Sequence, residues 1–85
     1  MPTVLRLNGY RFYFFSHEPN EPPHVHVDRA GASLKAWLDP VDLSRNRGFR
    51  PREINAILAM VTEHRGALLE AWDEHFGADS GRARG

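Results

Sequence analysis

The sequence predicts an α+β domain: a four-stranded antiparallel sheet of two β-hairpins, covered on one face by one long C-terminal amphipathic helix. Apolar and polar residues alternate in the first half of the chain, and apolar residues recur at three- and four-residue steps in the second half. With 85 residues, 41% of them hydrophobic, the chain has the length and the apolar content for one domain with one core. We expect that domain over residues 1–77 and a flexible tail over residues 78–85, which lack apolar periodicity.

The first hairpin is predicted from the Asn-Gly dipeptide at 8–9, because both turn residues tolerate positive φ. Residues 3–7 and 10–16 flank the turn as strands, and a two-residue loop sets their register. That register places Arg6 directly opposite Arg11 on one face. Like charges in such a pair are destabilising, so we expect the two side chains to meet an anion or an acid, or to spread into solvent.

The second hairpin follows a connection at residues 17–23, whose three prolines supply no backbone donors for regular structure. Residues 24–38 read as two alternating strands joined by an Ala-Gly turn at 30–31. A two-residue turn there places His26 opposite Lys35. The Ala-Gly signal is weaker than Asn-Gly.

A helix is expected after a basic and mostly irregular segment at residues 39–50. Pro51 suits the first helical position, and the apolar pattern runs for about 25 residues to Gly77. The apolar positions are Ile54, Ile57, Leu58, Val61, Leu68, Leu69, Trp72 and Phe76. Gly66 interrupts this stripe at a cost of roughly 1 kcal/mol relative to alanine, which allows a bend or a break. So long a stripe leaves apolar surface for a partner, so we expect a homo-oligomer or a hetero-complex.

The uncovered face of a sheet made from both hairpins would collect cations, histidines and aromatic rings. Its members are Arg6, Arg11, Tyr13, His24, His26, Lys35 and Trp37. The formal net charge is zero because eleven basic residues are cancelled by eleven acidic ones elsewhere in the chain. Neutrality therefore does not exclude a basic face.

The two histidines of this face are candidate catalytic residues. His24 and His26 are two residues apart on a strand, so their side chains leave the same face with Cα atoms about 6.5–7 Å apart. Ribonuclease-type transesterification needs a base, an acid and a cation beside the phosphorane. Histidine suits both proton-transfer roles because it ordinarily titrates near neutral pH, and Lys35 would supply the cation.

Two other interpretations of the histidine pair stay open. The same spacing lets both imidazoles reach one metal ion, for which Asp28, His17 or Glu21 would supply a third ligand. The ordinary alternative is a pair of polar residues on a solvated sheet face.

RNA contacts are expected from arginines and aromatic rings. Arg6 and Arg11 would contact phosphates, and the rings of Tyr13 and Trp37 would stack on unpaired bases. Trp37 is equally expected to be buried against the following segment. A second basic cluster precedes the predicted helix, where the helix dipole repels cations, which indicates phosphate binding unless nearby acids or solvent neutralise it. Its members are Arg45, Arg47, Arg50 and Arg52.

Three segments carry a family resemblance: M-P-T-V-L-R-L-N-G-Y-R-F near the start, then E-P-P-H-V-H-V, then R-N-R-G-F followed by R-E-I. Over about residues 1–77 the chain resembles the bacterial and phage family called "domain of unknown function four-one-six-zero". The resemblance implies a small cytoplasmic protein, often encoded beside a second small uncharacterised protein, as in toxin–antitoxin pairs. It implies no catalytic residues.

The residues predict a cytoplasmic protein that binds or acts on RNA, with a metal-independent, cofactor-free ribonuclease as one form, and the family resemblance implies that it is of toxin–antitoxin type. The alternatives are a non-catalytic module that binds a small cognate toxin or antitoxin, and a metal-binding domain using His24 and His26. The absence of cysteine excludes a thiolate metal site and a cysteine nucleophile. No apolar run approaches the roughly 20 residues of a membrane span. Motifs of nucleotide, serine or zinc hydrolases are absent.

Overall fold

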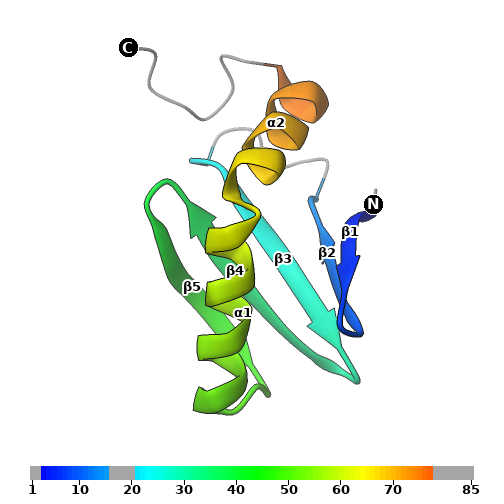
Figure 1. The fold of residues 1–85 in the computed structure, drawn as a ribbon, viewed down its shortest axis with the longest axis vertical. Helices are drawn as coiled ribbons and strands as arrows, with labels where there is room; N and C mark the ends of the chain where they lie inside the picture. Colours follow the sequence, from blue (N-terminus) through cyan, green and yellow to red (C-terminus); the bar gives the residue numbers. More distant parts are fainter. Residues whose placement is uncertain (1–2, 16–20, 78–85) are drawn as a thin grey trace.

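Two helices lie on one face of a five-stranded antiparallel sheet with the strand order β1-β2-β3-β4-β5 (Figure 1). The structure, a computed structural model, describes residues 3–15 and 21–77. The strands are β1 (Thr3–Leu7), β2 (Tyr10–Tyr13), β3 (His24–Arg29), β4 (Ala32–Leu38) and β5 (Val41–Arg47), and the helices are α1 (Pro51–Glu63) and α2 (Arg65–Phe76). The prediction of an α+β fold with an antiparallel sheet is confirmed. The tail predicted at 78–85 lies outside the described residues.

Both hairpins turn at the dipeptides expected from the sequence. Asn8 and Gly9 have φ values of 53° and 85°, and Ala30 and Gly31 have φ values of 50° and 85°. Positive φ at both central residues defines the type I′ turn, whose twist matches that of the flanking strands. Alanine rarely adopts this conformation, so the weaker sequence signal of the second turn reflects a real backbone cost.

The predicted registers are confirmed at their central pairs. Arg6 pairs with Arg11 across β1 and β2, and His26 pairs with Lys35 across β3 and β4. The two hairpins join into one sheet because β2 pairs with β3, which sets Tyr13 beside His26. The open face of this sheet is therefore continuous from β1 to β5.

The expectation of an irregular segment at 39–50 was wrong over most of its length, because β5 spans seven residues and six of them pair with β4. The β5 sequence is polar, and only Val41 and Leu43 pack against the core. An edge strand has a neighbour on one side only and solvent on the other, so its sequence needs little apolar alternation. The Asn46 side chain, near the end of β5, closes the turn that leads into α1. Its amide nitrogen donates to the Phe49 carbonyl, and its amide oxygen accepts from the Phe49 N–H.

The single long helix was also a wrong prediction, because α1 ends before His64 and α2 begins after it (Figure 1). The break lies two residues before Gly66, where the sequence allowed one. Arg65 is fastened to the end of β4, with its Nε donating to the Leu38 carbonyl at 2.7 Å and its Nη2 lying 2.6 Å from an Asp39 carboxylate oxygen. This long-range tie sets the start of α2 against the sheet.

The core lies between the sheet and the helices. The central residues of the helical stripe, Ile57, Val61, Leu68 and Trp72, are at most 1% exposed. They pack against Phe14, which directly follows β2, and against apolar residues of β2, β3 and β4, chiefly Phe12, Val25, Val27, Ala36 and Leu38. These positions of the stripe are therefore filled within one chain and leave no surface for a partner. Neither helix, in the residues that are described, combines the length and the apolarity that crossing a membrane requires.

Gly66→Ala is expected to raise the free energy of unfolding by about 0.5–1 kcal/mol. Gly66 lies in the first turn of α2, and a Cβ added there has no heavy atom within 4 Å. Alanine would reduce the conformational entropy of the unfolded chain without a clash. Urea denaturation followed by circular dichroism measures the change.

Gly48→Ala is the matched control and is expected to lower stability. Gly48 has a φ of +98°, and its added Cβ would lie 3.2 Å from the Cβ of Ala32. Alanine at position 48 is therefore strained in both backbone and packing. A loss of stability in Gly66→Ala as large as that in Gly48→Ala would contradict the helical environment of Gly66.

Candidate functional site

Two rows of polar and aromatic side chains cross the open face of the sheet from β2 to β5. Directly paired residues of neighbouring strands share a face, so the pairings define each row. The middle row is Tyr13, His26, Lys35 and Arg45. The row nearer the hairpin turns is Arg11, Asp28, Ser33 and Arg47. The middle row contains four of the residues predicted to bind or act on RNA.

The middle row borders a hollow of about 210 Å³, which we call the central hollow. Its lining consists of Tyr13, Phe15, His26, Ser33, Leu34, Lys35, Arg45 and Arg47. The hollow therefore combines three rings with three cations, and no carboxylate contributes to its lining.

Aromatic rings form one wall of the central hollow. The ring centroids of His26 and Phe15 are 4.3 Å apart, and those of His26 and Tyr13 are 5.4 Å apart with an interplanar angle of 23°. The Tyr13 hydroxyl donates to Asp28 at 2.9 Å, and the Arg11 guanidinium lies 4.5 Å from the Tyr13 ring centroid. These contacts hold the wall in one orientation.

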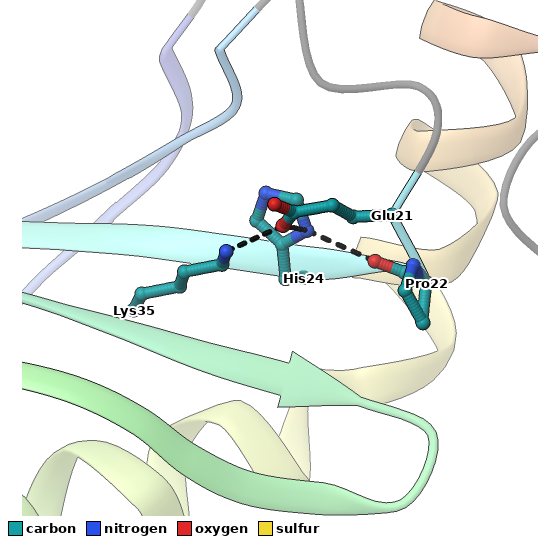
Figure 2. A network of polar contacts seen from close by, with 4 residues as sticks. All are labelled: Glu21, Pro22, His24 and Lys35. Atoms are coloured by element: carbon teal, nitrogen blue, oxygen red, sulfur yellow. Dashed lines mark hydrogen bonds and ion pairs between the residues drawn. The ribbon is translucent and has the colours of Figure 1, made fainter.

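A polar network lies beside the hollow at the start of β3 (Figure 2). Lys35 is only 6% exposed, and its ammonium forms an ion pair with the Glu21 carboxylate. The same carboxylate lies 3.6 Å from His24 Nδ1, which is also 2.9 Å from the Pro22 carbonyl oxygen. A carbonyl oxygen only accepts, so Nδ1 is the donor in that bond. The network compensates the charge of a nearly buried lysine.

His24 and His26 are neighbours, with ring centroids 5.2 Å apart, but their surroundings differ. His24 is fully buried, and its ring contacts Trp37 and Trp72. His26 is half-buried and lines the central hollow. The expectation that both histidines contact a substrate is corrected for His24, because its ring has no exposed surface. His24 instead connects Pro22, which precedes β3, to Trp72 of α2.

The described residues offer no third ligand that would complete a metal site with His24 and His26. Within residues 3–15 and 21–77, no group of three histidine, aspartate or glutamate side chains is arranged to hold a metal ion. Asp28 is occupied by the Tyr13 hydroxyl, and Glu21 by Lys35. His17, the other suggested ligand, lies outside the described residues.

The basic cluster before the helix is divided between two places. Arg45 and Arg47 lie on β5 and line the central hollow. Arg50 and Arg52 flank Pro51 at the start of α1, where the Arg50 N–H donates to the Glu53 carboxylate. Neither Arg45 nor Arg47 forms an ion pair with a carboxylate of the described ranges.

A second hollow of about 430 Å³ lies nearer the two hairpin turns, and we call it the turn-side hollow. Four arginines line it: Arg6, Arg11, Arg29 and Arg47. It shares Tyr13, Ser33 and Arg47 with the central hollow, so the two hollows adjoin. Trp37 lines neither of them; it is half-buried, and Lys35 Nζ lies 4.8 Å from its ring centroid.

A family model described as "Domain of unknown function (DUF4160)" matches residues 9–73. The chain belongs to this family. The matched residues include every residue that lines the central hollow. No curated protein and no solved structure matches the chain significantly.

Three polar or aromatic residues that line the two hollows were not singled out from the sequence. Phe15 continues the alternation of Arg11 and Tyr13 and was recognisable from it, whereas Ser33 carries no distinctive signal. Arg29 lies at the end of β3, with its guanidinium 4.8 Å from the Tyr10 ring centroid, and reaches the turn-side hollow beside Gly9. The position of Arg29 in the hollow depends on how the turns at residues 8–9 and 30–31 lie relative to each other, and no local sequence pattern determines this.

Proposed function

We propose that this DUF4160 chain binds single-stranded RNA on the open face of its sheet, with one base in the central hollow. The observation that carries the proposal is the lining of that hollow, which sets aromatic rings beside arginines that form no ion pair within the described residues. Base stacking on aromatic side chains and phosphate contacts from cations are the usual combination for unpaired RNA.

The two components would act on different parts of one nucleotide. The rings of His26 and Phe15 offer a surface for stacking, and their mutual contact limits the entropy lost when a base binds. Arg45 and Arg47 lie on the edge strand β5, on the other side of the hollow from these rings, and would pair with a phosphate. The neutral net charge of the chain does not oppose this, since the excess of cations is local to the open face.

Binding without cleavage is the form that the geometry favours. Transesterification by the predicted pair needs two histidines at the substrate, and only His26 lines the hollow. Lys35 is held by Glu21, which neutralises part of the charge a phosphorane would need. We therefore propose an RNA-binding member of a toxin–antitoxin-type pair, a biological setting that the family resemblance suggests.

The Arg45→Ala/Arg47→Ala double variant is expected to bind RNA about tenfold more weakly than the wild type, a loss of about 1.4 kcal/mol. Fluorescence anisotropy with a fluorescein-labelled 12-nucleotide single-stranded RNA measures the affinity at low salt. The reason is the loss of both phosphate contacts beside the stacking wall.

The matched control is Arg50→Ala/Arg52→Ala, which removes the same charge at the start of α1. It is expected to change the affinity less than twofold. Equal weakening by the two double variants would show that net charge alone attracts RNA and would contradict a site in the central hollow. A wild-type protein that binds no RNA but co-purifies with the product of a neighbouring gene would favour the protein-interaction alternative.

The same samples test for cleavage. Incubated RNA is expected to remain intact on a denaturing gel. Cleavage products that disappear in His26→Ala, with binding retained, would replace the binding-only proposal with a ribonuclease.

A further inference from the structure

We infer that the bound strand continues from the central hollow into the turn-side hollow, with a second phosphate against Arg6 and Arg11 and a ribose 2′-hydroxyl at Ser33. This inference rests on the proposed function and extends it, because it gives the strand a path and selects RNA over DNA. It involves three features: the continuity of the two hollows, a pair of facing arginines that form no ion pair within the described residues, and the place of Ser33.

The hollows are continuous along the strand direction. The middle row and the turn-side row are two residues apart on each strand, which corresponds to about 6.5–7 Å. This is close to the length of one extended nucleotide. Tyr13, Ser33 and Arg47 line both hollows, so a strand that leaves the central hollow passes directly over them.

The turn-side hollow carries an excess of positive charge. Arg6 and Arg11 are paired directly across β1 and β2, an arrangement that costs stability unless an anion is present. Arg11 is held in place, because its Nε donates to Thr3 Oγ1 at 2.8 Å. Neither arginine forms an ion pair within the described ranges. A phosphate between them would relieve their repulsion.

Asp28, the cross-strand partner of Arg11, neutralises only part of this charge. It is the one carboxylate in the lining of the turn-side hollow, and its Oδ1 accepts a hydrogen bond from the Tyr13 hydroxyl at 2.9 Å. Across both hollows the described lining contains this single acid and six cations, of which Lys35 is paired with Glu21: Arg6, Arg11, Arg29, Lys35, Arg45 and Arg47. A polyanion that crosses both hollows meets this charge along its whole path.

Ser33 lies where the two hollows join. It pairs with Asp28 on β3 and with Arg47 on β5, and it is half-buried. Its hydroxyl makes no side-chain hydrogen bond to the described part of the chain. A 2′-hydroxyl both donates and accepts, as serine does, so the two groups are complementary. DNA lacks this group and would leave Ser33 without the contact.

The path is tested with two labelled 12-nucleotide strands of the same sequence, one RNA and one DNA. Arg6→Ala is expected to weaken RNA binding about fivefold and to reduce the slope of log K against log salt by about 0.7, the value for one lost phosphate contact on a single strand. Arg6→Gln, which keeps a long polar side chain, is expected to behave alike. Thermal unfolding of both variants verifies that they fold.

Ser33→Ala is expected to weaken RNA binding about tenfold and DNA binding less than twofold. Its matched control is Ser44→Ala, an exposed serine of β5 outside both hollows, which is expected to leave both affinities unchanged.

The outcomes separate this inference from the proposed function. If Arg45→Ala/Arg47→Ala weakens RNA binding while Arg6→Ala and Arg6→Gln change neither affinity nor salt slope, the path is wrong and the central hollow stands. Equal losses for RNA and DNA in Ser33→Ala would overturn the ribose contact. A wild-type protein that binds neither strand would overturn both proposals.

Discussion

Trp72→Ala is expected to lower the free energy of unfolding by about 3–5 kcal/mol, the largest effect of any substitution considered for this protein. The Trp72 side chain is completely buried. Its ring centroid lies 4.2 Å from that of Phe76, 5.4 Å from that of Phe14 and 5.1 Å from that of His24. The residue thus joins α2 to β3 and to the segment directly after β2, and its removal leaves a cavity at the contact between the layers.

The matched control is Trp37→Ala, which truncates the other tryptophan of the chain. Trp37 is half-buried on the open face, and its truncation is expected to cost about 1–2 kcal/mol. Guanidinium denaturation followed by circular dichroism measures both values. Equal losses for the two variants would contradict the placement of α2 on the face opposite Trp37. Folded proteins have only about 5–15 kcal/mol of total stability, so the Trp72 variant is expected to unfold at a clearly lower temperature than the wild type.

Glu21→Ala is expected to lower stability by about 2 kcal/mol, because it removes the carboxylate that pairs with the nearly buried Lys35 ammonium. The Trp37 ring, 4.8 Å from Lys35 Nζ, would remain as a weaker partner. Breaking a fully buried pair costs about 3–5 kcal/mol. The value expected here is smaller because the Glu21 side chain is 42% exposed and solvent screens the pair.

The double variant Glu21→Ala/Lys35→Met identifies the cause. Methionine is similar in length to lysine but has no charge. Lys35→Met therefore removes the ammonium group that Glu21→Ala leaves without a carboxylate partner. The double variant is expected to recover most of the stability lost in Glu21→Ala. If it is as unstable as the single variant, the loss arises from the loop that Glu21 anchors and not from the lysine charge. Urea denaturation of the wild type, Glu21→Ala, Lys35→Met and the double variant completes this double-mutant cycle.

Much of the candidate site was predictable because it depends on strand alternation and turn chemistry. Two dipeptide turns set the registers that put Arg6 opposite Arg11 and His26 opposite Lys35. Both relations are local, since they connect residues within one hairpin. The pairing of β2 with β3 then brings Tyr13 to His26 on the same face; alternation predicts the shared face, whereas the register between the two hairpins depends on how they pack together.

The different roles of the two histidines were not predictable from the H-x-H pattern. Alternation assigns His24 and His26 to one face, but their burial depends on what lies beyond the end of the strand. Trp72 of α2 and the Glu21–Pro22 segment cover His24, whereas His26 remains at the hollow. The residues that cover His24 are distant in sequence or lie in a proline-rich connection with no periodic pattern.

By itself, the sequence determined the two hairpins, the apolar helical stripe and the family, because turn dipeptides, alternation and motifs are local properties of the chain. Tertiary structure alone decided that the polar segment 41–47 becomes an edge strand, which needs the backbone donors and acceptors of β4 more than apolar side chains of its own. It also decided the break at His64, where Arg65 reaches back to Leu38. By adding Arg45 and Arg47 to the lining that contains His26, that edge strand completes the central hollow, a site composed of residues from four strands that only pairing brings together.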